Sequence, residues 1–240
     1  MLARTLFFIS ILIFEGLCFG SQKDLTKGHS FLLETQRTKI RLVRVEDIPR
    51  LTEFQIDRGP EYGRMNGFSE EFWNEEKVRL IVEESNSSIP KAKSLPKVKG
   101  INFDFGIWFE GYLVGVVGFA TNPSVGFAKN VGAIRKSANC VALSYGLDPT
   151  FRGIGLAEEA VREIIGYLFE DLGYDAVTAV ILEQNIPSIK LVDKIGFESF
   201  GVWTGYYGGI AELQSFIHHK FYRKQWKPCD RLLKPRETAR

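Results

Sequence analysis

The chain has 240 residues, 45% of them hydrophobic, which is enough for one domain with a large core. Its 31 basic and 29 acidic residues leave a formal net charge of +2, too weak a field to indicate a nucleic-acid-binding protein. The three cysteines, Cys18, Cys140 and Cys229, lack the spacing of a zinc site or a redox pair. We therefore expect free thiols, no metal and no direct binding of nucleic acid.

Residues 1–20 differ from the rest of the chain. A basic start is followed by a nearly unbroken apolar run over residues 5–14, and small residues lie at positions 18 and 20. This pattern predicts a signal peptide or leader cleaved near Gly20, although Glu15 interrupts the apolar run, which is too short to span a membrane. A wrongly assigned start codon and an anchoring helix are the alternatives. A polar linker, residues 21–30, then leads to a single expected domain over residues 31–226.

The first half of that domain predicts three strands and two helices. Glu46 and Asp47 place negative charge at the positive end of the first helix. Glu110 and Gly111 separate two strand-like runs, which is the pattern of a β-hairpin. Gly115 in the second run indicates a bulge or a close backbone approach. The expected strands are residues 39–45, 102–109 and 112–120, and the expected helices are residues 46–54 and 72–84.

The stretch from residue 142 to residue 172 has the pattern of a strand, a glycine turn and a helix. The strand runs to Leu147, and Pro149 stops it because proline cannot donate to a β-ladder. Gly153 and Gly155 lie just before the helical pattern. Backbone N–H groups at a helix start lack partners and carry partial positive charge, so this turn suits a phosphate group. A tight structural turn is the alternative interpretation.

The remaining residues predict three strands and one helix. Gly173 is expected as the left-handed cap of the preceding helix, and the β-branched run AVTAVIL is typical of a buried strand. A short helix begins near Pro187 and Ser188 and ends at Gly196. The expected strands are residues 176–182, 197–203 and 215–222, and a basic tail follows at residues 227–240.

Two ordered motifs resemble the GCN5-related N-acetyltransferases (GNAT), and within them the RimJ/RimL-like branch that acetylates the N-termini of ribosomal proteins. The first motif, residues 152–157 (RGIGLA), matches the family's acyl-CoA loop: Arg or Gln, two residues, Gly, one residue, then Gly or Ala. The second, residues 185–188 (NIPS), is similar to the family's Asn-x-x-Ser segment and is followed by a helix. The order of elements matches over residues 31–226 and is closest over residues 141–202.

The resemblance implies an α+β (α/β three-layer) fold, with a mixed, mostly antiparallel sheet of about seven strands and helices on both faces. The sheet splays between its fourth and fifth strands, and the thioester arm of acetyl-CoA, the co-substrate, lies in the gap. Backbone amides of residues 154–157 would hold the pyrophosphate, and Asn185 and Ser188 would line the pantetheine. The implied cofactor-binding residues are Leu147, Arg152, Gly153, Ile154, Gly155, Leu156, Ala157, Asn185 and Ser188.

Acetyl transfer to an amine needs a neutral amine, donors for the oxyanion and a proton for the leaving thiolate. Relatives often carry a Glu on the strand before the loop, but that place here is Ala142. Glu183 is the nearest remaining carboxylate, with a solvated loop side chain as the alternative. Tyr207, expected with Tyr206 in the loop between the last two strands, and Ser188 are candidate proton donors. The alternatives are aromatic packing for the tyrosines and a helix N-cap for the serine.

Two consecutive histidines, His218 and His219, lie in the last expected strand. Side chains alternate across a regular strand, so at most one of the two faces the gap. A core or surface position is the expectation for each of them.

The sequence thus predicts transfer of an acetyl group from acetyl-CoA to a primary amine, a protein N-terminus or a small amine, by direct attack in a ternary complex. Ala142 also leaves open a silent acyl-CoA-binding or interaction module. A dinucleotide-binding oxidoreductase is the remote alternative, and its glycine fingerprint fails at Glu158. We expect a monomer or a homodimer. A cytosolic cofactor favours the cytoplasm, while residues 1–20 leave export or membrane attachment open.

Overall fold

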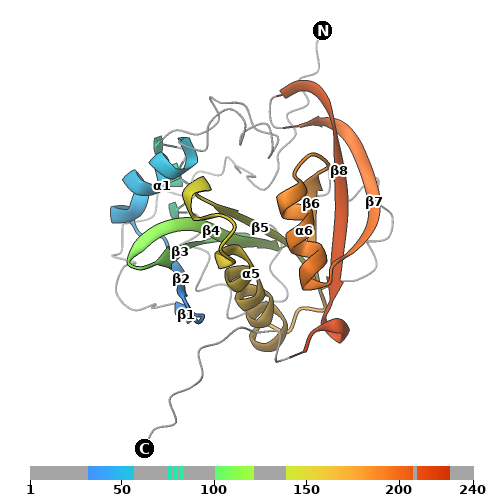
Figure 1. Ribbon diagram of the computed structural model, residues 1–240, viewed down its shortest axis with the longest axis horizontal. Coiled ribbons are helices and arrows are strands. Elements are labelled where there is room, and N and C mark those ends of the chain that lie inside the picture. The colour runs from blue at the N-terminus through green and yellow to red at the C-terminus, as the bar shows by residue number, and fades with distance from the viewer. Residues whose placement is uncertain are drawn as a thin grey trace, which may run out of the picture.

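The computed structural model describes residues 32–56, 75–83 apart from 77 and 81, 101–121, 139–207 and 210–227. The described residues form one mixed sheet of eight strands, in the order β1-β2-β3-β4-β5-β6-β8-β7 (Figure 1). The strands are β1 (Leu32–Glu34), β2 (Thr38–Leu42), β3 (Ile101–Phe109), β4 (Tyr112–Thr121), β5 (Cys140–Leu147), β6 (Ala176–Leu182), β7 (Glu198–Tyr207) and β8 (Ile210–Tyr222).

The described helices are α1 (Ile48–Ile56), α5 (Leu156–Gly166) and α6 (Ile186–Ile195). Residues 75–76, 78–80 and 82–83 are also helical, within the helix that the sequence predicts at 72–84. Short 3-10 turns occupy Val45–Asp47, Pro149–Phe151 and Arg223–Gln225. A π-helical turn, Tyr167–Asp171, continues α5 to the point where Gly173 takes a φ of 73°.

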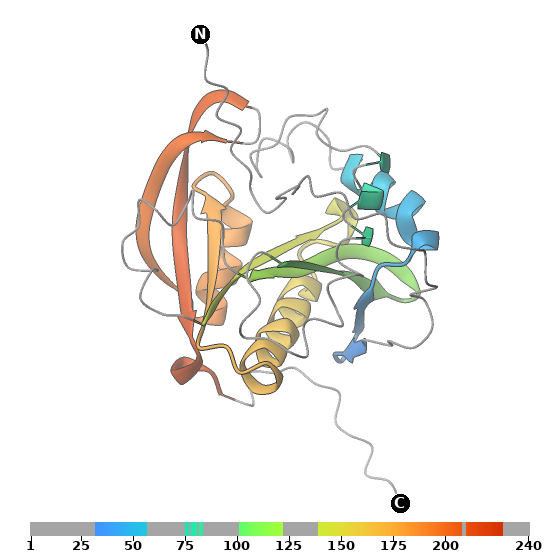
Figure 2. The same cartoon turned by 180° about the vertical axis from the view of Figure 1, so that it is seen from behind.

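The sheet separates between β5 and β6, its only parallel pair among the described strands. Their ladder joins only Cys140–Ala142 to Ala176–Thr178, whereas β5 stays paired with β4 as far as Leu147. Figure 2 shows the two strands meeting at one end and diverging toward the other. The predicted splay between the fourth and fifth strands is therefore confirmed, because β5 and β6 are the fourth and fifth strands that the sequence predicts.

The β3–β4 hairpin follows the local sequence closely. Its turn consists of Glu110 and Gly111, with φ angles of 50° and 84°, a left-handed conformation that favours glycine. The register of the two strands shifts at Ile107 and Trp108, where the ladder moves from Gly115 to Leu113 on β4. This irregularity is the bulge expected near Gly115.

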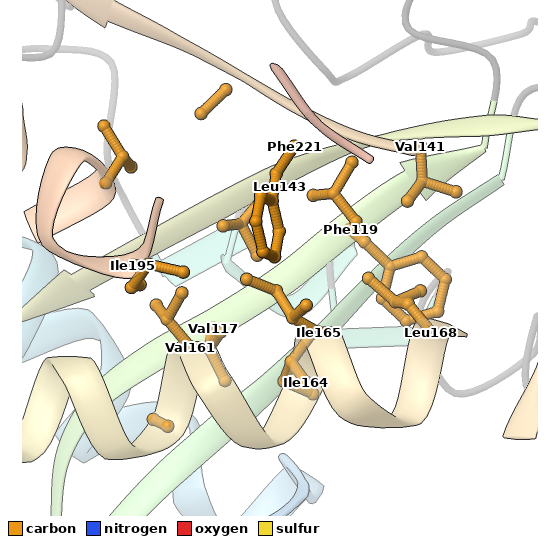
Figure 3. Close-up of a cluster of buried hydrophobic side chains, with 14 of the residues drawn as sticks. Val117, Phe119, Val141, Leu143, Val161, Ile164, Ile165, Leu168, Ile195 and Phe221 are labelled. Atoms are coloured by element: carbon orange, nitrogen blue, oxygen red, sulfur yellow. The ribbon is translucent and has the colours of Figure 1, made fainter. Parts of the chain in front are cut away.

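The main core lies between one face of the sheet and the helices α5 and α6, which run side by side in Figure 1. Val117 of β4 and Leu143 of β5 pack there with Val161 and Ile164 of α5 and with Phe221 of β8, as Figure 3 shows. All five side chains are at least 92% buried. The alternation of apolar residues in β5, the apolar run of β4 and the helical spacing in α5 build this core.

A second core covers the opposite face of the sheet. Leu113 of β4 packs with Ile48 and Leu51 of the α1 region and with Val78 and Val82 of the helical segment at residues 75–83. Successive residues of β4 thus serve different cores, as expected for a strand buried on both faces. The helices cover both faces of the sheet, which confirms the predicted three-layer fold.

Three predicted elements need correction. The sheet has an eighth strand, β1, three residues long, which is too short to give a periodic pattern. The last hairpin is longer than predicted, because β7 continues to Tyr207 and β8 begins at Ile210. Tyr207 therefore ends a strand instead of lying in a loop. Helix α6 begins two residues early, at Ile186, so Ser188 lies inside its first turn.

No described helix is both long and apolar enough to cross a membrane. The predicted signal peptide or leader, the linker and all but the first residue of the basic tail lie outside the described residues.

Candidate functional site

The turn between β5 and α5 is shaped by its own polar groups. Asp148 accepts a hydrogen bond from the backbone N–H of Thr150 at 2.9 Å and forms an ion pair with Arg50 at 2.9 Å. Burial opposes ionisation of the Asp148 carboxylate, but the hydrogen bonds from Thr150 and Arg50 outweigh it and lower its pKa. Arg152 folds back and donates from Nε to the carbonyl oxygen of Leu147 at 3.1 Å. The end of β5 is thereby fixed relative to the loop.

The two glycines of the loop are required by its backbone. Gly153 has a φ of 80° and Gly155 a φ of 89°, in the left-handed region that other residues rarely adopt. Gly155 occupies the N-cap position of α5, and no side chain caps the helix there. The free N–H groups of the first turn are thus left to an external acceptor. An added Cβ on Gly153 would meet nothing within 4 Å, so the loop is open on that side.

An ion pair between an exposed guanidinium and a buried carboxylate contacts this loop. Glu159 of α5 is 5% exposed and pairs with the guanidinium of Arg37, in the turn between β1 and β2. Thr35 donates to the same carboxylate at 2.8 Å. Arg37 also donates from Nη1 to the carbonyl oxygen of Ile154 at 2.8 Å. This cluster has no local sequence signal, because Thr35 and Arg37 lie more than 110 residues from Ile154 and Glu159.

The turn between β6 and α6 is built differently. The Asn185 side chain caps α6 by accepting from the backbone N–H of Ser188 at 3.3 Å, and Pro187 stands in the first turn, where its missing N–H costs nothing. The N-cap of α6 is thus Asn185, which excludes the helix-cap alternative for Ser188. Gly196 ends the helix with a φ of 110°, as predicted.

The two turns lie at the same edge of the sheet, because both follow the carboxyl ends of parallel strands. The hydroxyl of Tyr145 on β5 donates to the carbonyl oxygen of Ser188 on α6 at 3.1 Å, across the region where the strands diverge. Lys194 of α6 pairs with Glu158 of α5 at 2.7 Å, and Arg162 of α5 pairs with the same carboxylate at 3.1 Å. These contacts tie α6 to β5 and to α5, the elements next to the two sequence motifs.

The three candidate catalytic residues lie just after β6, in the first turn of α6 and at the end of β7. Glu183 is exposed at the end of β6, and its backbone N–H donates to Ser215 at 2.8 Å. Ser188 is partly buried in the first turn of α6. Tyr207 pairs with Ile210 through the backbone at the far end of the last hairpin, and its side chain lies outside the described part of the chain. Ala142 stands at the end of the β5–β6 ladder, opposite Thr178.

Other ionisable residues lie in the interior. His218 and His219 are each 1% exposed and face opposite sides of β8: His218 contacts the ring of Phe200, and His219 lies 3.9 Å from Asp193 of α6. Burial lowers the pKa of both imidazoles, as expected for core histidines. Cys140 is a free, partly buried thiol whose pKa burial raises. No cluster of three or more metal-ligating side chains occurs within the described ranges.

Comparison with known proteins decides the family. Residues 37–198 match the family model described as an acetyltransferase (GNAT) domain. The chain belongs to the GNAT family. Within that family's fold, the splayed strands β5 and β6 and the glycine loop have the arrangement expected from the sequence. The mostly antiparallel sheet also differs from the parallel sheet of a dinucleotide-binding unit.

Individual members support this assignment. An N-acetyltransferase 9-like protein of Caenorhabditis elegans is 32% identical over 90 residues, which are 33% of this chain and 45% of that protein. The chain spans about half the length of the first curated relatives it matches.

Two solved GNAT structures share the fold. RimJ of Mycobacterium smegmatis, in complex with CoA-disulfide, superposes with a TM-score of 0.60 and 13% identity, covering 78% of this chain and 83% of that one. The ribosomal-protein-S5-alanine acetyltransferase of Vibrio fischeri has a TM-score of 0.59 and 17% identity, covering 82% and 99%. Both structures thus share the overall fold of this chain.

Proposed function

We propose that this protein transfers the acetyl group of acetyl-CoA to a primary amine, by direct attack within a ternary complex. The observation that carries the proposal is the uncapped start of α5, which follows the end of β5 that is no longer paired with β6. Unpaired N–H groups suit a pyrophosphate, and diverging strands expose backbone groups to which an extended ligand can hydrogen-bond.

The proposed cofactor-binding residues divide by position. The backbone of Ile154–Ala157 would bind the pyrophosphate, and Arg152 adds positive charge at the end of β5. Leu147 precedes the loop, and Asn185 and Ser188 stand across the gap at the start of α6, on the expected pantetheine side. When bound, acetyl-CoA supplies the activated acyl group. The protein chain orients the acyl group and supplies the hydrogen-bond donors around it.

The chemistry requires a balanced exchange of groups. The neutral amine nitrogen forms a bond to the acetyl carbon, the carbon–sulfur bond breaks, and CoA leaves as a thiolate that takes up a proton. Glu183 is proposed to accept the proton of the amine, directly or through water. Ser188 and Tyr207 are proposed as donors, Ser188 because its helix start faces the gap and Tyr207 as an aromatic hydroxyl on the neighbouring hairpin.

The acceptor is proposed to be a protein N-terminus or a small amine. Solved relatives whose names specify ribosomal proteins favour a protein acceptor. A cytosolic cofactor favours action in the cytoplasm, residues 1–20 keep export as the alternative, and a monomer or homodimer is our expectation. A silent acyl-CoA-binding module is the second candidate, because Ala142 stands where relatives often carry a carboxylate.

Release of free thiol from acetyl-CoA, measured against a panel of peptides and small amines, tests the proposal. We expect thiol release that depends on both the amine and the enzyme. CoA binding without turnover on any acceptor would favour the silent module. Isolation of an acetylated residue that is competent for turnover would contradict direct attack.

A further inference from the structure

We propose that Arg37 is a positioning residue that holds the acyl-CoA loop in its binding conformation, with Glu159 and Thr35 as its anchor. The inference rests on the proposed binding of acetyl-CoA at the start of α5. Neither sequence motif contains these residues, and they come from the turn between β1 and β2 and from the fourth position of α5.

The guanidinium of Arg37 contacts two different parts of the site. Nε donates to Oε1 of Glu159 at 2.5 Å, and Nη2 lies against the same oxygen. Nη1 donates to the carbonyl oxygen of Ile154 at 2.8 Å. A planar guanidinium holds these donors in a fixed fork, so the position of Glu159 determines where Nη1 meets the loop.

Glu159 is itself held from several directions. Thr35 Oγ1 donates to Oε2 at 2.8 Å, and the backbone N–H of Arg37 approaches the same oxygen at 3.3 Å. A buried carboxylate is stable only when its oxygens are paired in this way. Thr35 is 1% exposed and also contacts Thr38 at 2.8 Å, which ties the anchor to β2. The guanidinium therefore rests on a rigid base.

The loop needs such a support. Ile154 lies between two glycines with positive φ, and its side chain is 49% exposed, so packing contributes little to its position. Glycines on both sides give the free loop many conformations, and ordering them on binding costs entropy. The hydrogen bond from Arg37 fixes the carbonyl of Ile154 before the ligand arrives. An added Cβ on Gly155 would lie 3.0 Å from Nη2, which shows how closely the guanidinium follows the loop.

A simple stabilising ion pair would use the same contacts but predicts a different outcome. It would lower thermal stability when removed and leave the CoA affinity of the folded protein unchanged. A positioning residue lowers the affinity itself. Arg41 of β2 provides a matched control, because it forms a two-pronged, partly buried ion pair with Asp47 and donates to the carbonyl oxygen of Leu42 instead of to the acyl-CoA loop.

The test is calorimetric titration of CoA into the full chain and its Arg37→Met and Arg41→Met variants. We expect Arg37→Met to raise Kd about tenfold, the scale of one lost hydrogen bond to a charged group, while Arg41→Met changes Kd less than twofold. In turnover assays the KM for acetyl-CoA should rise with kcat nearly unchanged. Equal Kd values for the unmodified chain and a folded Arg37→Met variant would overturn the inference.

Two further variants keep the test decisive if Arg37→Met does not fold. Arg37→Lys keeps the charge, but one ammonium group reaches either Glu159 or Ile154, so we expect a Kd between those of the unmodified chain and a variant without the side chain. Glu159→Gln leaves Arg37 in place but weakens its anchor, and should also raise Kd. Unchanged Kd in both variants would contradict the inference alone. Failure of the unmodified chain to bind CoA would instead remove the proposed function.

Discussion

The two strand-to-helix turns at the splayed edge differ in whether a side chain accepts a hydrogen bond from the backbone N–H groups at the helix start. At the start of α6, the Asn185 side chain accepts the N–H of Ser188, and Pro187 has no N–H to satisfy. At the start of α5, Gly155 has no side chain, and nothing caps the first turn. The chain thus closes one turn by itself and leaves the donors of the other to a ligand.

The two turns are also held by contacts from different sides. The carbonyl of Ser188 is contacted from the facing strand by Tyr145, so α6 is tied across the gap. The loop before α5 is instead held through a carbonyl group, because Arg37 donates to the carbonyl oxygen of Ile154. This contact leaves the backbone N–H groups of the loop open. Glycine in the α5 loop therefore leaves the backbone N–H groups accessible to a ligand, whereas Asn185 in the α6 turn stabilises the helix start.

The largest expected effect comes from Gly155→Glu. The substitution forces a bulky anion into a position with a φ of 89°, where an added Cβ would already lie 3.0 Å from Arg37. We expect CoA affinity to fall by about a hundredfold or more, since backbone strain, crowding and repulsion of phosphate act together. Calorimetric titration measures the loss.

The hairpin glycine Gly111 provides a control for that strain. It has a φ of 84°, and an added Cβ there would meet nothing within 4 Å. Gly111→Glu should therefore lower stability through the same backbone strain while leaving CoA affinity intact. Similar CoA affinities for folded Gly155→Glu protein and the unmodified chain would remove the α5 loop from the binding site.

A smaller effect separates the two roles proposed for Asn185. Asp is as good an N-cap as Asn, so Asn185→Asp should keep the free energy of unfolding within about 0.5 kcal/mol. It replaces an amide donor by a carboxylate, so we expect CoA affinity to fall about tenfold if the side chain also lines the cofactor. Titration combined with urea unfolding checks both quantities.

Asn185→Ser keeps a capping oxygen without adding charge, and Asn185→Ala removes the cap. The alanine variant should lose about 1 kcal/mol of unfolding free energy. If the aspartate variant binds CoA as tightly as the unmodified chain, Asn185 acts on the helix alone and the contrast between the two turns becomes sharper.

The smallest expected effect concerns pH, and it distinguishes the β8 region from the α5 turn. Burial lowers the folded-state pKa of His218 and His219 below the ordinary value of 6.5. Between that value and their folded pKa the unfolded chain binds more protons, so the free energy of unfolding falls as pH decreases from about 6.5. The slope is at most about 1.4 kcal/mol per pH unit for each histidine.

The carboxylates near α5 respond at lower pH. Hydrogen bonds and ion pairs lower the pKa of Asp148 and Glu158 despite their partial burial, so their contribution is lost only as pH falls through those depressed values. Urea unfolding at pH 7.5, 6.5 and 5.5 measures the histidine effect. His218→Asn should flatten the slope, and an unchanged slope in both single histidine variants would contradict the assignment.

Local signals account for the parts that the sequence predicted well. Glu110-Gly111 defined the β3–β4 hairpin to within one residue at each end, and the glycines at 153 and 155 placed the turn before α5. These features depend on residues that are neighbours in the sequence, so the sequence alone is enough to predict them. The splay came from the family resemblance, since no local pattern specifies where a ladder ends.

Distant contacts account for what was missed. Glu159 is 122 residues from Arg37, and its acidic side chain in a helical pattern reads as solvent-exposed. Strands β7 and β8 extend beyond the predicted bounds, because Tyr206 and Tyr207 were expected in the loop between them. The cap of α6 is Asn185, whereas the sequence offered Ser188 as an alternative cap. Two good cap residues three positions apart leave that choice to the fold.

The most direct test of the central claim is to follow the backbone amides of isotope-labelled protein by NMR while CoA is added. We expect the N–H resonances of residues 154–157 to shift strongly, because these groups are proposed to bind the pyrophosphate. The N–H of Ser188, already paired with Asn185, should shift much less. Saturable CoA binding that leaves the amides of residues 154–157 unmoved would contradict the account.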